Sequence, residues 1–324
     1  LYSMIGSIGN YALVNEEPDY AIKNVALFKF IDHRLYNKYF LHLINSFVIE
    51  RQIQKAMKGG TQKFVSLKIL RNLKIPLPPL DQQKKIAAIL DAADAYRQKT
   101  KALIEKYDEL TQSLFLDMFG DPVTNQKEWD KVLFSEIATF HNGDRGKNYP
   151  SQSAFVEMGI PFINAGNLNN YVIDNKGLNF ISNERFDLLN SGKIKLEDIL
   201  FCLRGSLGKF AVNRTHDIGA IASSLVIIRI NKHVTLDYIT GLLKTNYIAG
   251  LIKKSDNGSS QPNLSAKSVK EFTIPLPSFE LQNQFAERVQ AIEAQKAQAQ
   301  ASLAQAEDLF NSLLQRAFKG ELTS

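Results

Sequence analysis

The side chains best suited to chemistry in this chain are amides and cations, and they gather in three loops of its second half. Asparagine and glutamine can read adenine edges, while arginine and lysine can read guanine or hold phosphate. Any single asparagine is more commonly a turn former, so the prediction depends on the three loops converging in the fold. The candidate nucleic-acid-binding residues are Asn164, Asn167, Asn169, Arg204, Ser206, Lys209, Gln261, Asn263 and Lys267, with Gln62 and Lys63 in the first half.

Two glycines, Gly205 and Gly208, lie within the second of these loops. They either let backbone amides approach a phosphate or form a tight turn between two strands, and the turn is the favoured interpretation.

Catalytic and metal-binding patterns are missing from the sequence. The loop Gly-Asp-Arg-Gly-Lys-Asn at 143–148 lacks the spacing and the Ser or Thr of a phosphate-binding P-loop. The five histidines have no metal-ligand spacing, and no Gly-x-Gly-x-x-Gly is present for a dinucleotide or S-adenosylmethionine. Cys202, the single cysteine, lies in an apolar run and is predicted to be a small buried residue. We therefore expect no catalysis, no metal and no cofactor in this chain.

The chain carries one pattern twice, at an offset of 199 residues that holds from the first residue nearly to the last. Ile-Pro-Leu-Pro occurs at 75–78 and again at 274–277, and Gly6 with Gly9 matches Gly205 with Gly208. A repeat this long indicates duplicated domains and not a solenoid of small units. Residues 120–199 have no counterpart before Leu1, so we expect roughly 70 residues of the first copy to be absent.

Two segments, 81–118 and 280–319, have the pattern of long helices that need a partner. Apolar and small residues recur mainly at spacings of four and three, as in a coiled coil, and neither segment contains Gly or Pro. The simplest arrangement packs the two helices against each other, antiparallel; the alternative is a helix lying on its own domain. The predicted packing residues are Ile86, Leu90, Leu103, Tyr107, Leu110 and Leu114, and Phe285, Val289, Ile292, Leu309 and Leu313.

The two helical segments carry no net positive charge. The formal net charge is +6; residues 1–80 carry +6 and residues 120–279 carry +3, whereas 81–119 and 280–319 are close to neutral. A basic surface is typical of a protein that binds a polyanion, most often nucleic acid, although a generic solvated surface explains the charge equally well. No apolar run is long enough to span a membrane, so we expect no membrane contact and a cytoplasmic location.

The remaining segments mix short strands with short helices. Strands are predicted at 160–163, 199–203, 210–213 and 224–230, helical spacing covers 236–252, and 255–263 is a loop. The predicted fold class is α+β, with two similar mixed domains, the first incomplete, separated by two long antiparallel coiled-coil helices. The expected boundaries are 1–80 and 121–279 for the domains, and 81–120 and 280–324 for the helices.

The order of several short motifs resembles the specificity subunit of type I restriction-modification enzymes. These are Gly-Ile-Pro-Phe-Ile-Asn-Ala-Gly-Asn-Leu at 159–168, Ile-Ser at 181–182, Asp-Ile-Leu-Phe at 198–201, Arg-Gly-Ser-Leu-Gly-Lys at 204–209, Gln-Pro-Asn-Leu at 261–264, and Ile-Pro-Leu-Pro at 274–277 before a long helix. Each motif alone is weak, but the ordered series is specific and covers nearly the whole chain. The family has two target recognition domains, each reading half of a split DNA site, and two antiparallel spacer helices.

The resemblance implies a subunit without catalysis that binds double-stranded DNA. Its partners would be two methyltransferase (M) subunits and a restriction (R) subunit, which hold the S-adenosylmethionine, ATP and Mg used for DNA methylation and cleavage. The sequence departs from the family plan by lacking the first part of its first domain. Ile5 stands where the second copy has Arg204, and Phe64 where it has Asn263, so the two domains are expected to read different half-sites.

Two other functions fit the sequence. One is a structural or assembly protein whose basic domains bind protein partners. The other is the recognition part of a larger single-chain restriction-methylation enzyme, which the upstream sequence would reveal.

Overall fold

The computed structural model describes residues 1–14, 17, 19, 21–57, 64–255 and 263–322, and they form two compact units. Unit 1 comprises Leu1–Glu105 and Lys296–Ser324, and unit 2 comprises Lys106–Gln295. The protein is therefore a mixed helix and sheet structure in which each unit takes part of two long helices.

Unit 2 is built on a six-stranded sheet in the order β4-β13-β10-β11-β8-β7, beside a four-stranded sheet in the order β12-β6-β9-β5 and a pair β14-β3. The strands predicted at 160–163, 199–203, 210–213 and 224–230 are β6, β10, β11 and β13. The elements are β3 Lys131–Leu133, α5 Phe134–Ile137, β4 Ala138–Asn142, η1 Gln152–Ala154, β5 Phe155–Val156, β6 Ile160–Ile163, η2 Ala165–Asn167, β7 Leu168–Asn169, β8 Tyr171–Ile173, β9 Asn179–Ile181, α6 Asn183–Asp187, β10 Ile199–Cys202, β11 Phe210–Val212, β12 Ala220–Ile221, β13 Leu225–Ile230, α7 Leu236–Leu243, α8 Asn246–Ser255, α9 Ala266–Lys270 and β14 Thr273–Pro275.

The central strand β10 and the first four residues of β13 are buried on both faces of the sheet, which explains the unbroken apolar run in each. Alternate side chains point to opposite faces. Phe201 and Val226 join the core that includes the helices, whereas Leu200 and Cys202 join the core on the other face. Cys202 is fully buried as predicted, and burial raises the pKa of its thiol.

The helical spacing predicted over 236–252 is divided between α7 and α8. The break falls at the junction of the two, where the buried Thr245 hydroxyl donates to the Leu242 carbonyl at 2.7 Å. A threonine that bonds back to the preceding turn competes with the helical ladder, so the predicted helical segment consists of two helices.

Unit 1 has the plan of the later part of unit 2. Its elements are β1 Tyr2–Ser3, β2 Val25–Ala26, α1 Asn37–Ile44, α2 Phe47–Met57 and α3 Leu67–Arg71. The same hydrogen bond recurs at the 199-residue offset: Tyr39 donates to the Pro76 carbonyl, and Tyr238 donates to the Pro275 carbonyl. Burial raises the pKa of Tyr39 to about 12 and also raises that of Tyr238. The duplication predicted from the sequence is thus present in three dimensions.

A buried glutamine joins each long helix to the chain that precedes it. The Gln83 amide donates to the carbonyls of Arg34 and Pro78 and accepts from the Tyr36 backbone N–H, all within 2.8 Å. Gln282 repeats two of these contacts, accepting from the Thr235 N–H and donating to the Pro277 carbonyl. Both glutamines are fully buried, and these hydrogen bonds satisfy the polar atoms of their amides.

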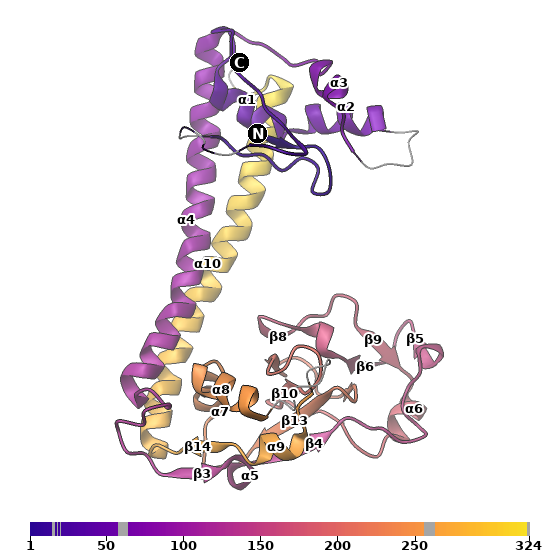
Figure 1. Ribbon diagram of the computed structural model, residues 1–324, viewed down its shortest axis with the longest axis vertical. Coiled ribbons are helices and arrows are strands. Elements are labelled where there is room, and N and C mark those ends of the chain that lie inside the picture. Colours follow the sequence, from indigo (N-terminus) through magenta and orange to yellow (C-terminus); the bar gives the residue numbers. More distant parts are fainter. Residues whose placement is uncertain (15–16, 18, 20, 58–63, 256–262, 323–324) are drawn as a thin grey trace. The chain divides into compact units, whose positions relative to one another are not determined.

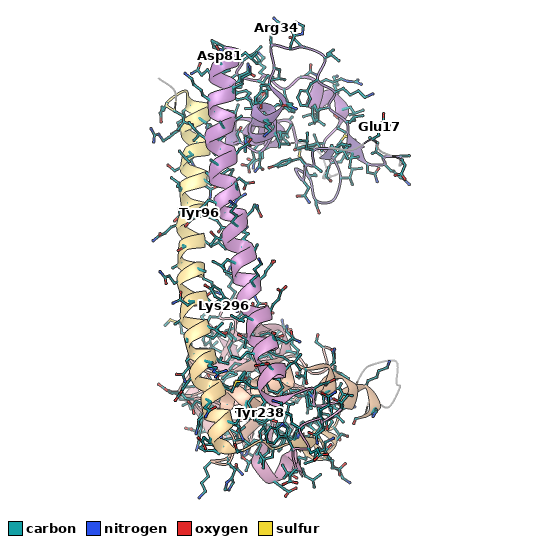
Figure 2. The ribbon with its side chains drawn as sticks, turned by 90° about the vertical axis from the view of Figure 1, so that its left-hand side faces the viewer. Glu17, Arg34, Asp81, Tyr96, Tyr238 and Lys296 are labelled. Atoms are coloured by element: carbon teal, nitrogen blue, oxygen red, sulfur yellow. The ribbon has the colours of Figure 1, made fainter. Side chains whose placement is uncertain are left out.

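The two long helices are α4 (Leu80–Phe119) and α10 (Phe279–Lys319), close to the predicted limits, and they lie side by side (Figure 1, Figure 2). Positive-φ glycines, Gly120 and Gly320, follow their ends. The helices run antiparallel: in unit 1, Lys101 pairs with Glu307 at 3.2 Å, and the Arg97 guanidinium lies 4.4 Å from the ring centre of Phe310.

The predicted packing residues are buried near the N-terminal end of each helix and are partly exposed further along it. Ile86, Leu90, Phe285 and Val289 are buried, and Tyr107, Leu114, Ile292 and Leu313 are half-buried, whereas Leu103, Leu110 and Leu309 are 43%, 49% and 54% exposed. The buried positions in their place are Thr111, Phe115, Phe310 and Leu314. An α-helix has 3.6 residues per turn, so a contact line drifts away from a strict 3.5-residue repeat by about 20° per heptad.

The buried Gln83 is expected to stabilise unit 1 through its three hydrogen bonds to the preceding chain. Gln83→Ala removes the hydrogen-bond partner of the Tyr36 N–H and of two carbonyls, so the free energy of unfolding should fall by about 1–3 kcal/mol. The matched control is Gln54→Ala, because Gln54 is exposed and its amide donates to the Glu50 side chain of the same helix. Urea denaturation measures both variants, and equal effects would contradict this role of Gln83.

The shifted seam predicts opposite behaviour for two leucines of the same helix. Leu90→Ala removes a fully buried side chain and should cost about 2–5 kcal/mol, whereas Leu103→Ala should change stability by no more than about 0.5 kcal/mol. Thermal unfolding followed by circular dichroism compares them. A large loss for Leu103→Ala would restore the seam predicted from the sequence.

Candidate nucleic-acid interface

The turn between β10 and β11 carries three of the predicted residues: Arg204, Ser206 and Lys209. Gly205 and Gly208 have φ angles of 79° and 77°, so they are tight-turn glycines, as the favoured interpretation held. The register Phe201↔Phe210 makes this turn the tip of a hairpin at one end of the six-stranded sheet.

A groove of about 760 Å³ lies beside this hairpin tip, within unit 2. Its walls are the hairpin turn, the turn between β7 and β8, and the junction of α7 with α8. Lys209, Lys244 and Lys253 line it, and no acidic side chain occurs among its described lining residues. A concave surface whose described charged side chains are all cations concentrates positive potential and attracts an anion.

Lys209 joins the asparagine loop to the hairpin. Its ammonium donates to the Ala165 carbonyl at 3.1 Å and to Asn169 Oδ1 at 3.2 Å. The Asn169 amide in turn donates to Asp174 at 3.1 Å, and the Lys176 N–H and Asn169 hold the pKa of the Asp174 carboxyl below its ordinary value. Two predicted loops therefore converge, as the sequence argument required.

Asn164 and Asn167 have structural roles within that loop. Asn164 Oδ1 accepts from the Gly166 N–H at 2.8 Å, and Asn167 Oδ1 accepts from the Asn164 N–H at 3.0 Å. Asn167 is also buried. The turn-forming alternative therefore describes both, and neither amide is directed to a ligand by these contacts.

Arg204 and Asn263 lie opposite each other in an antiparallel bridge, so the second and third predicted loops meet here. Both are exposed, and the Arg204 guanidinium forms no ion pair or hydrogen bond with the residues that the structure describes. Arg145, which sequence reasoning set aside, lies at the same end of the sheet, where it donates to the Ser223 carbonyl at 3.3 Å. The sequence feature that could have indicated Arg145 was its place in the basic, Gly-rich loop at 143–148.

The other predicted residues lie elsewhere or outside the described chain. Lys267 is in the first turn of α9, largely exposed, with its ammonium 3.9 Å from Glu271. Gln62, Lys63 and Gln261 fall outside the described residues.

Tyr171 and Lys244 were missed by sequence reasoning. Tyr171 follows the turn residue Asn170, and its ring centre lies 4.9 Å from that of Phe210 and 4.2 Å from the Lys244 ammonium. Neither residue belongs to a motif, because the contact joins a strand end to a helix junction distant in sequence.

The equivalent bridge in unit 1 has apolar partners. Ile5 pairs with Phe64 where unit 2 pairs Arg204 with Asn263, and both apolar side chains are exposed. The two copies therefore offer different chemistry at the same place.

No group of three or more His, Cys, Asp or Glu side chains placed to hold a metal occurs within the described part of the chain. Among the same residues, no helix combines the length and apolar character needed to cross a membrane.

Comparison with known proteins gives consistent matches along the chain. The family model described as "Type I restriction modification DNA specificity domain" matches residues 1–107 and 126–307. The EcoBI specificity subunit of Escherichia coli is 24% identical over 322 residues, covering 89% of this chain and 66% of the relative. The MjaVIII specificity subunit of Methanocaldococcus jannaschii is 27% identical over 272 residues, covering 78% and 63%. The chain thus spans slightly less than two thirds of these curated relatives.

Two solved structures share the fold. A type I restriction-modification S subunit from M. genitalium matches with a TM-score of 0.54 at 19% identity, covering 98% of this chain and 82% of that one. A chain from a structure of type I restriction-modification complex assembly matches with a TM-score of 0.59 at 20% identity, covering 88% and 71%. Because the family model covers most of the chain, the protein belongs to the type I restriction-modification DNA specificity family.

Proposed function

We propose that this chain is a non-catalytic DNA sequence-recognition subunit of a type I restriction-modification complex. The observation that carries the proposal is the basic end of the unit 2 sheet, where the lysine-lined groove adjoins the exposed Arg204. Phosphate groups hold the protein on the duplex through such cations, and an exposed arginine beside Asn263 is suited to reading a base edge.

The two copies would each read one half of a bipartite target. Ile5 and Phe64 replace Arg204 and Asn263, which supports different half-sites for the two domains. We propose domains at 1–80 and 121–279, with spacer helices at 81–120 and 280–324. The packing of α4 against α10 supports a role for the helix pair in setting the gap between half-sites.

The partners in this proposal are double-stranded DNA, two methyltransferase subunits and a restriction subunit, in the cytoplasm. S-adenosylmethionine, ATP and Mg would be held by the partner subunits. The relatives, which are specificity subunits of type I restriction enzymes, support the assignment to such a complex.

Arg204→Ala is expected to weaken binding to duplexes that the protein itself selects from a random library, by about 1–3 kcal/mol, with relaxed preference at one position. The matched control is Lys232→Ala, an exposed cation after β13, at the end of the sheet away from the hairpin tip. Anisotropy titrations at several salt concentrations measure both. Equal effects of the two substitutions, or binding indifferent to salt, would favour the assembly-protein alternative.

Removing one heptad from facing turns of α4 and α10 should shorten the preferred gap by about three base pairs, since seven helical residues rise about 10 Å. Sequencing of methylated adenines in cells that express the complete complex reads the gap directly. An unchanged gap with active methylation would remove the spacing role of the helices.

A further inference from the structure

The turn between β7 and β8 contains a tyrosine where a glycine is expected. Leu168 pairs with Ile173 and Asn169 with Val172, so the hairpin turn consists of Asn170 and Tyr171. Their φ angles are 48° and 64°, the left-handed values that two-residue hairpins require. Asparagine tolerates this region, but a bulky side chain is disfavoured there, and Asn-Gly is the preferred pair.

The Tyr171 side chain has a defined use on the groove wall. Phe210 packs against the ring, tilted by 43°, and the Lys244 ammonium lies 4.2 Å from its centre. Tyr171 still keeps 45% of its surface exposed and lines the groove together with Lys244. The aromatic ring therefore holds a cation at the edge of a groove that has no described acidic lining residue.

We propose that Tyr171 and Lys244 form a clamp for the phosphate backbone of DNA, and that the strained turn is retained for this purpose. This inference rests on the proposed function and specifies which residues hold the duplex. Backbone binding is favoured over base stacking because the ring already packs against Phe210 and Lys244. An ammonium and a phenol hydroxyl offer donors, which suit phosphate oxygens that only accept.

Three substitutions separate the roles of charge, ring and hydroxyl. Lys244→Met removes the cation and should reduce the slope of log affinity against log salt by about 0.9, the value of one phosphate contact. Tyr171→Gly removes the ring and relieves the turn, so affinity should fall about tenfold while the thermal midpoint stays level or rises. Tyr171→Phe keeps the ring but removes the hydroxyl donor, so its affinity should lie between those of the parent protein and Tyr171→Gly.

The control is Lys131→Met, since the Lys131 ammonium also lies over a tyrosine ring, Tyr247 at 5.7 Å, but outside the groove. Its salt slope should equal that of the parent protein. The assay uses the full chain with a labelled random-sequence duplex, measured by anisotropy across a salt series, and thermal unfolding of each variant.

The possible results separate the clamp from the proposed function. Salt-dependent binding that survives Lys244→Met and Tyr171→Gly unchanged would overturn the clamp and leave DNA recognition standing. A second result would also contradict the clamp: Tyr171→Gly lowers the thermal midpoint, and Lys244→Met keeps the salt slope of the parent protein. In that case the Tyr171 ring would only contribute to packing. If the parent protein shows no salt-dependent binding, both the proposed function and the clamp fall.

Discussion

The structure depends on the antiparallel packing of two long helices, because neither compact unit completes its core with a single one. In unit 1, Leu90 of α4 and Phe310 of α10 belong to one hydrophobic cluster. In unit 2, the ring centres of Phe115 of α4 and Phe285 of α10 lie 5.7 Å apart within a second hydrophobic cluster. A fold of this kind couples the helices to the domains, since loosening either helix exposes apolar side chains in the core it shares.

The two copies share their buried hydrogen bonds but differ in some packing residues and in exposed residues of the candidate interface. Gly241 of α7 lies so close to Phe115 that a Cβ there would be 2.7 Å from the ring. The equivalent residue in unit 1 is His42, with Leu314 standing in the place of Phe115, and the histidine ring lies 2.8 Å from Asp91. The buried glutamines are retained in both copies, because an unpaired buried amide or carbonyl is costly. An exposed position has no such cost, because water can replace a lost partner. The exposed Arg204 of unit 2 is therefore replaced by Ile5 at the equivalent position of unit 1.

Some residues of the candidate interface stabilise its loops, and others are exposed and available to contact DNA. Asn164 and Asn167 shape the loop, Lys209 joins that loop to the hairpin, and Arg204 remains exposed. The Tyr171 turn is the part of the interface that local preference does not explain. A residue kept in a disfavoured conformation, beside a cation and at a groove, is more consistent with a binding role than with a contribution to stability.

The sequence alone determined the features that depend on local periodicity and on repetition. The two helices and their limits follow from spacing and terminal glycines, four strands of unit 2 from apolar runs, the hairpin from Gly205 and Gly208, and the duplication from a constant offset. Tertiary structure decided which face of each helix is buried in its middle, because a small drift per turn accumulates over many turns and moves Leu103 and Leu110 into solvent. It also decided that Lys209, Lys244 and Lys253 share a groove. Those properties arise from contacts between segments far apart in the chain, and no local pattern encodes such contacts.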